Sequence, residues 1–258
     1  FDRHLKQDAA ARSRPLAPVR YFSMGDNVWR DAQSWPPEGV TETSLFLHSD
    51  GRANTRRGSG RLSRQPPGAD EPADGFRADP AAPTPSCPVT ESRPLKAAIW
   101  GPVDQSATED RDDVLVYTGE PLAAPLTFAG NVRAVLHVST DTADADWAVK
   151  LVEVRPDGTA TNIVRGIRRG RYRGALLEPQ LMEPGRVYEL EVDLGPVAAM
   201  IPPGHRLRVD ISGADFPLYD RNPNTAEGIR GSRTAIANEK VHHGVATPSR
   251  IILPCLSR

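Results

Sequence analysis

The sequence has little cysteine, no long apolar run and no excess of charge, and each shortage excludes a class of protein. Its two cysteines among 258 residues, Cys87 and Cys255, cannot form a disulfide framework, and neither lies in a CxxC metal spacing. One disulfide is possible, but two free thiols in a reducing, cytoplasmic compartment are the expectation. No apolar run approaches the about 20 residues that span a bilayer, and the N-terminal FDRHLKQ lacks the apolar core of a signal peptide.

Charge and motif content exclude further classes. The net charge is −1, so nothing in it favours binding to nucleic acid or to an anionic membrane. The sequence contains no Gly-x-Ser-x-Gly nucleophile elbow, no HExxH and no dinucleotide or phosphate-binding glycine pattern. We therefore expect no catalytic residue, no metal and no cofactor in this chain. A triad assembled from scattered residues, such as Ser212 with His205, stays open but is not favoured, because triads are defined by geometry.

What the chain does have is a series of short, alternating apolar stretches. Apolar and polar residues alternate cleanly over 132–139 and 188–194, as in antiparallel strands with one buried face. Turn residues separate the stretches at the spacing expected of a β-sandwich. Residues 155–159, RPDGT, predict a tight turn that joins 146–155 and 160–173 as a hairpin. The predicted strands are 19–24, 45–48, 114–118, 126–140, 146–155, 160–173, 186–194, 205–212 and 249–253.

Two segments do not fit that pattern. Residues 2–11 favour a short helix, since alanine, lysine and glutamine are good helix formers. Residues 51–98 read as mostly irregular, with many glycines and prolines, and a loop region of that length usually covers another surface or carries function.

Charged clusters favour structural roles. On a strand, Arg165, Arg169, Arg171 and Arg173 would share one face and could bind phosphate or carboxylate. Because the net charge is near zero, we favour a solvated or interdomain face that is salt-bridged to aspartates. Residues 141–146 lack the glycine and glutamate of an EF-hand loop and predict an acidic turn between strands.

The stretch 204–225 offers the strongest indication of function. Leu207, Val209 and Ile211 alternate with charged residues, and the strand then opens into a polar loop that carries Phe216 and Tyr219, GHRLRVDISGADFPLYDRNPNT. Such a loop is a plausible functional site, although a structural corner in which the two aromatic rings plug the sandwich is the more frequent outcome.

This stretch resembles the C-terminal domain of the cocaine esterase and X-prolyl dipeptidyl-peptidase (CocE/NonD) serine hydrolases. Four further segments resemble the family in the same order: VRYFSMGDNVWRDAQSWPP (19–37), GPVDQSATEDRDDVLVYT (101–118), RGIRRGRYR (165–173) and TPSRIILP (247–254). The resemblance implies an all-β fold, a galactose-binding-like jelly-roll β-sandwich with long irregular loops and a short N-terminal helix.

The resemblance also implies a division of labour between domains. Residues 1–18 would be the end of an α/β-hydrolase domain, and 19–258 the C-terminal sandwich, so that nucleophile and base lie outside this chain; a start at Phe1 without methionine suggests a fragment. The whole protein would hydrolyse ester, amide or X-Pro dipeptide bonds through an acyl-enzyme. The chain would stabilise the catalytic domain and wall the acyl pocket of its small ester, amide or peptide substrate. The candidate wall residues are Ile99, Trp100, Phe216 and Tyr219.

Two other readings stay open. A free-standing carbohydrate- or ligand-binding jelly roll could stack sugars on Trp29, Trp35 and Trp100. A purely structural domain would support the enzyme without touching substrate. A homo-oligomer is possible, and the sequence does not decide it.

Overall fold

The computed structural model of the chain describes residues 5–6, 9–10, 16–88 and 101–256. Within these ranges the regular structure is mostly strand, with two single-turn 3₁₀-helices, η1 (Gly170–Tyr172) and η2 (Gly228–Arg230). The strands are β1 (Val19–Ser23), β2 (Val28–Ala32), β3 (Val40–His48), β4 (Arg61–Ser63), β5 (Asp74–Ala78), β6 (Val114–Gly119), β7 (Leu126–Thr140), β8 (Asp146–Val154), β9 (Ala160–Arg169), β10 (Tyr188–Ile201), β11 (Arg206–Ser212), β12 (Ala237–His242) and β13 (Arg250–Leu256).

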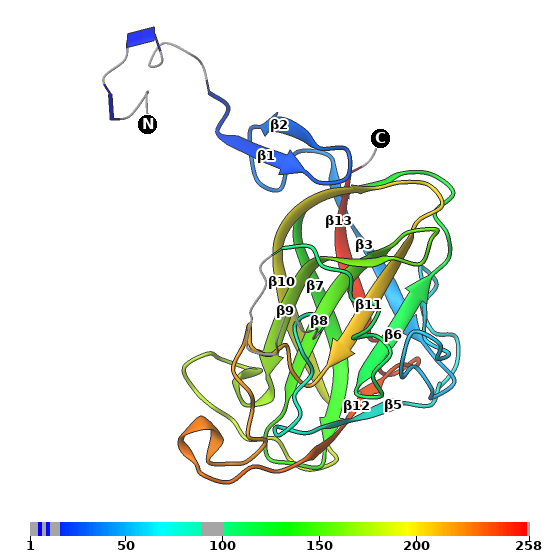
Figure 1. Ribbon diagram of the computed structural model, residues 1–258, viewed down its shortest axis with the longest axis vertical. Helices are drawn as coiled ribbons and strands as arrows, with labels where there is room; N and C mark the ends of the chain where they lie inside the picture. The colour runs from blue at the N-terminus through cyan, green and yellow to red at the C-terminus, as the bar shows by residue number, and fades with distance from the viewer. Residues whose placement is uncertain (1–4, 7–8, 11–15, 89–100, 257–258) are drawn as a thin grey trace.

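Eleven of these strands form one continuous ladder that folds back on itself into a sandwich. The order is β5-β12-β7-β13-β3-β4-β6-β11-β8-β9, and β10 pairs with β7 as well. All pairs in it are antiparallel except β4 with β6. The β1–β2 hairpin pairs separately and stands at one end of the sandwich, above β10 and β13 (Figure 1).

The ends of the ladder meet where β9 lies against β10. At Gly166 a Cβ atom would lie 2.1 Å from the backbone oxygen of Asp193, so only glycine allows this approach. The enclosed core is apolar, and its largest fully buried side chains are Trp147, Tyr117 and Phe128. The all-β sandwich expected from the sequence is confirmed.

Both strands with clean alternation are present, one with the predicted bounds and one longer than predicted. β7 has the bounds expected for it, and the β8–β9 hairpin is confirmed, with Arg155 N donating to Thr159 O at 2.9 Å across the turn. β10 runs seven residues beyond the predicted end, because the strand continues through a β-bulge between Asp193 and Gly195, with φ of +90° at Gly195.

Four strands were not predicted from the sequence: β2, β4, β5 and β12. β4 has three residues, and β5 (DGFRA) and β12 (ANEKVH) carry few apolar side chains, so no period stands out. β4 and β5 lie inside the stretch predicted to be irregular. Of the predicted helix 2–11 only residues 5, 6, 9 and 10 are described, and residues 9 and 10 are helical.

Candidate functional site

Phe216 lies where two distant loops are joined through their backbones. It follows β11, and the amide of Phe216 donates to Thr84 O at 3.0 Å while Ser86 N donates to Phe216 O at 2.7 Å. Tyr219 N closes the turn onto Asp215 O at 3.1 Å. The loop after β11 is therefore fastened to residues 84–86, directly before the segment 89–100.

A buried ionic cluster fixes this junction to the sheet. Lys150 of β8 and Arg165 of β9 stand opposite each other in register, and Asp215 lies within 3.1 Å of Lys150 Nζ and 3.3 Å of Arg165 Nη1. Arg165 Nη1 also donates to Ser86 O at 2.9 Å. Lys150 and Asp215 are almost inaccessible to solvent, so each charge depends on the others for compensation.

Residues 101–105, which follow the segment 89–100 in the sequence, are fixed to the start of β9. Asn162 accepts a hydrogen bond from Val103 N at 2.8 Å and donates to Gly101 O at 3.2 Å. Gln105 donates its backbone N–H to Ala160 O at 2.6 Å, and its side chain accepts from Lys150 Nζ at 3.1 Å. Residues 84–86 and 101–105 are thus both held over β8 and β9.

Of the four predicted wall residues, two can be placed. Ile99 and Trp100 lie outside the described residues, whereas Phe216 is half-buried beside the start of their segment. Tyr219 is 36% exposed, and burial raises the pKa of its hydroxyl, an effect that the charge of Asp215 increases and that of Arg165 opposes. A hollow of about 200 Å³ opens beside Tyr219, between Ile167, Tyr172 and Leu176.

The arginine run is engaged in ion pairs with aspartates, as predicted. Arg169 binds both oxygens of Asp146 at 2.9 Å, and Arg171 Nε lies 2.6 Å from Asp144. The expectation that the run forms one strand face is wrong, because β9 ends at Arg169 and the chain turns into η1. Arg173 packs over the ring of Tyr188 instead.

The serine, histidine and carboxylate groups do not form a triad in the part of the chain that is described. His205 precedes β11 and Ser212 ends it, which separates them by roughly 20 Å. The buried His243 contacts carboxylates with both ring nitrogens, Asp74 at 2.7 Å and Glu71 at 3.3 Å. The nearby Ser49 donates to Asp74 rather than to the histidine, so no base activates its hydroxyl.

Among the described residues, no group of three or more histidine, cysteine, aspartate or glutamate side chains has an arrangement that could hold a metal ion. No helix in these ranges has the length and apolar character of a membrane span.

Among the described residues, Trp29 and Trp35 do not form a sugar-binding platform. Trp35 packs edge-on against Tyr21, with ring centroids 5.3 Å apart, and is partly buried. Trp29 is 60% exposed but tilts onto Phe22, with Arg20 over its ring. Trp100 lies outside the described residues.

Sequence reasoning overlooked the residues that hold the site together, Lys150, Asn162 and Gln105. For Lys150 a signal existed, because a lysine in the middle of the apolar strand AVKLVEV must be buried with a partner or break the strand. Asn162 and Gln105 are polar residues in polar surroundings of the sequence, and only the fold shows that both are buried.

Known proteins share this architecture. A sequence profile described as "X-Pro dipeptidyl-peptidase C-terminal non-catalytic domain" matches residues 13–252. Cocaine esterase from Rhodococcus sp. (strain MB1 Bresler) is 40% identical over 263 residues, covering 100% of this chain and 45% of that protein.

Solved structures agree with the profile. An aminopeptidase from a marine-sediment Thaumarchaeota archaeon superposes with a TM-score of 0.83 at 31% identity, over 99% of this chain and 42% of its own. An α-amino acid ester hydrolase superposes with a TM-score of 0.83 at 30% identity, over 99% of this chain and 43% of its own. The chain therefore spans less than half the length of these relatives.

A β-sandwich in which no triad is assembled among the described residues, and which matches the C-terminal part of larger hydrolases, defines a class: the non-catalytic accessory domain of a hydrolase. Within that class the assignment is specific. The chain belongs to the family of X-Pro dipeptidyl-peptidase C-terminal non-catalytic domains, the C-terminal sandwich of CocE/NonD-type hydrolases.

Proposed function

We propose that this domain supports the α/β-hydrolase domain of a serine hydrolase that cleaves ester, amide or X-Pro dipeptide bonds, and that it walls part of the acyl pocket. The observation that carries the proposal is the anchoring of residues 84–86 and 101–105 over β8 and β9, beside Phe216. Residues 84–86 and 101–105 therefore have fixed positions on the sheet, and they flank Ile99 and Trp100 in the sequence.

Under this proposal the chain contributes position and an apolar surface, not a reacting group. The acyl-enzyme would form on a serine of the catalytic domain, with histidine as base and an oxyanion hole. Ile99 and Trp100, with Phe216 and Tyr219 as neighbours, would contact the acyl or peptidyl group. Such contacts decide which substrates fit, because even one methylene in a pocket changes selectivity.

The docking surface for the catalytic domain would include the β1–β2 hairpin. Phe22 and Trp29 are 40% and 60% exposed and form a cross-strand aromatic pair on this hairpin. Exposed apolar clusters of this kind mark interaction sites. We assign residues 1–18 to the end of the catalytic domain and 19–258 to the sandwich.

We further propose that the protein works in a reducing, cytoplasmic compartment. The two cysteines, both free and buried, suit such a compartment.

The test changes the wall in the longer hydrolase that carries this domain. Asn162→Ala removes the anchor of residues 101–103, and Ile99→Ala with Trp100→Ala removes the proposed contacts. Both should change the ratio of kcat/KM between a large and a small acyl substrate by about tenfold, while activity toward the small substrate is largely kept. Val245→Ala, at an exposed apolar residue outside the site, is the matched control.

An unchanged substrate ratio in both wall variants would contradict the wall function. The domain would then be a structural support only. Equal losses for all substrates would point the same way, since they would reflect general destabilisation rather than selectivity.

A further inference from the structure

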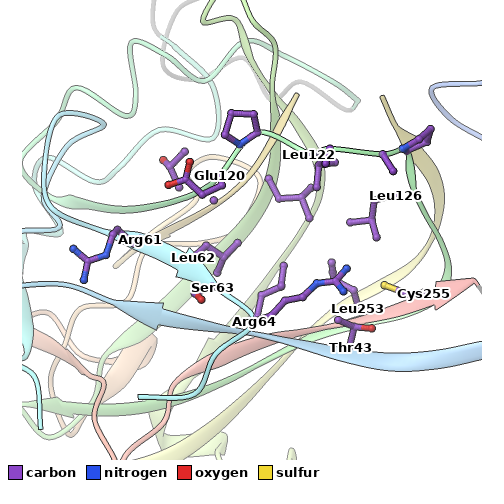
Figure 2. Close-up of a pocket in the computed structure, with 18 residues that line it drawn as sticks. Thr43, Arg61, Leu62, Ser63, Arg64, Glu120, Leu122, Leu126, Leu253 and Cys255 are labelled. Carbon is purple, nitrogen blue, oxygen red and sulfur yellow. The ribbon is translucent and has the colours of Figure 1, made fainter. Parts of the chain in front are cut away.

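A second hollow opens at the end of the sandwich where β6 passes to β7, and it shares no residue with the Asp215–Tyr219 junction. Its volume is about 580 Å³, within the range of sites that hold small organic ligands. Its walls are mostly aliphatic and come from both layers (Figure 2): Leu45, Leu62, Leu122, Leu126, Leu207 and Leu253.

The rim of this pocket is held in place by the backbone. Leu122 N donates to His205 O at 2.8 Å, and Gly204 N donates to Leu122 O at 2.8 Å. These two bonds tie the connection 120–125 to the turn before β11. The pocket is therefore preformed, and a ligand would not have to order the rim on binding.

Two arginine side chains at this pocket have no protein partner among the described residues. Arg61 and Arg64 both line it, and neither side chain makes a hydrogen bond or ion pair with any residue that the structure describes. Burial raises the pKa of the Cys255 thiol in the pocket wall, and a hydrogen bond with Thr43 and the charge of Arg64 oppose that rise. The guanidinium of Arg64 is thus close enough to act on the pocket interior.

The negative charge at the rim is weak by comparison. Glu120 lines the mouth, but its side chain is 92% exposed and lies 3.7 Å from Arg206. Arg61 and Arg64 are exposed as well, but unlike Glu120 they have no partner of opposite charge among the described residues. The local balance favours an anion.

From this arrangement we propose that the pocket binds an amphiphilic monocarboxylate, such as a medium-chain fatty acid with on the order of ten carbons. The hydrocarbon chain lies among the leucines, and the carboxylate pairs with the guanidinium of Arg64, whose planar fork matches two carboxylate oxygens. Arg61 adds to the positive field at the mouth. This binding site does not depend on the hydrolytic function proposed above.

The experiment is calorimetric titration of the chain with sodium hexanoate, octanoate and decanoate. Each added methylene should strengthen binding by up to about fourfold until the pocket is filled. Arg64→Gln should weaken decanoate binding about tenfold, the loss of one charge-assisted contact. Arg57→Gln, the same change at an exposed arginine outside the pocket, should leave it unchanged.

Three further measurements separate this ligand from other occupants. Decanol and decyltrimethylammonium should bind at least tenfold more weakly than decanoate, and Ala124→Trp at the exposed mouth should block decanoate. Decanoate should also slow the alkylation of Cys255 by N-ethylmaleimide but not that of Cys87, which does not line the pocket.

Several results would overturn the assignment. They are the absence of decanoate binding, equal affinity in Arg64→Gln, and equal affinity for the neutral or cationic amphiphile. Protection of Cys255 in the longer hydrolase without added decanoate would also overturn it, because a protein segment would then fill the pocket.

Discussion

At the scale of single residues, the most unusual group is the carboxyl of Glu239 in β12. It is buried, and neither oxygen has a hydrogen-bond partner among the described residues. Burial raises the pKa of Glu239 well above its ordinary value, and the nearby Asp146, Asp144 and Asp141 add to the rise. The folded state therefore keeps this proton at pH values where the unfolded chain has lost it.

That difference gives a pH dependence with a definite sign. Glu239 costs no stability below the pKa of the unfolded chain, and its cost grows as the pH rises above about 4.5. In Glu239→Gln this part of the slope disappears, so the variant should gain on the wild type by up to about 1.4 kcal/mol per pH unit above that point. Urea unfolding between pH 4 and 8 measures it; parallel curves for the two proteins would contradict the assignment.

The ionic cluster at the site makes a second prediction. Asp215→Asn leaves Lys150 and Arg165 buried without their common counter-ion, which should lower the free energy of unfolding by about 3–5 kcal/mol. Asp31→Asn, at an aspartate whose side chain is 61% exposed, should change it by less than about 0.5 kcal/mol. Equal and small effects in the two variants would show that the cluster does not hold the junction.

These residues also show how much of the site could be predicted from the sequence. The alternating pattern reveals which strand residues face the core, because period two follows from strand geometry. It does not reveal that Lys150, Asp210 and Arg165 form a polar row across β11, β8 and β9 on the other face. That face is buried by residues 84–86 and 101–105, and loop positions carry no periodic signal.

At the scale of elements, the contact between β9 and β10 closes the sandwich and depends on one glycine. Gly166→Ala would place a methyl group 2.1 Å from the Asp193 backbone oxygen, which cannot move without disturbing the β10–β7 ladder. We expect a loss of about 3 kcal/mol or more. Gly174→Ala meets only the Gln180 side-chain oxygen at 3.8 Å and should be nearly neutral in thermal unfolding.

A Gly166→Ala variant as stable as Gly174→Ala would mean that the two strands lie further apart than described. Sequence reasoning predicted strands at β9 and β10, although β9 ends four residues earlier and β10 seven residues later than predicted, and it could not show that they touch. They are separated by residues 170–187 and form no ladder with each other, so neither turn chemistry nor register indicates their contact.

At the scale of the whole molecule, the structure explains why the family resemblance predicted more about function than the residue patterns did. Fold class follows from strand spacing, but a sandwich is compatible with many functions. The assignment to an accessory domain rests on the match to the C-terminal part of larger hydrolases and on the missing triad geometry among the described residues. The chain spans less than half the length of these relatives, so an activity of theirs cannot be read from its residues alone.

The most direct test of that central claim is mass spectrometry of the purified chain after treatment with a fluorophosphonate probe, beside the longer hydrolase treated in the same way. We expect the mass of the chain to stay unchanged and the longer protein to gain one phosphonyl group. Ser139 does contact His242 at 2.9 Å, but no described carboxylate binds the other ring nitrogen of that histidine, so no triad activates a described serine. A phosphonyl adduct on a serine of the chain alone would contradict the account and make the sandwich an enzyme in its own right.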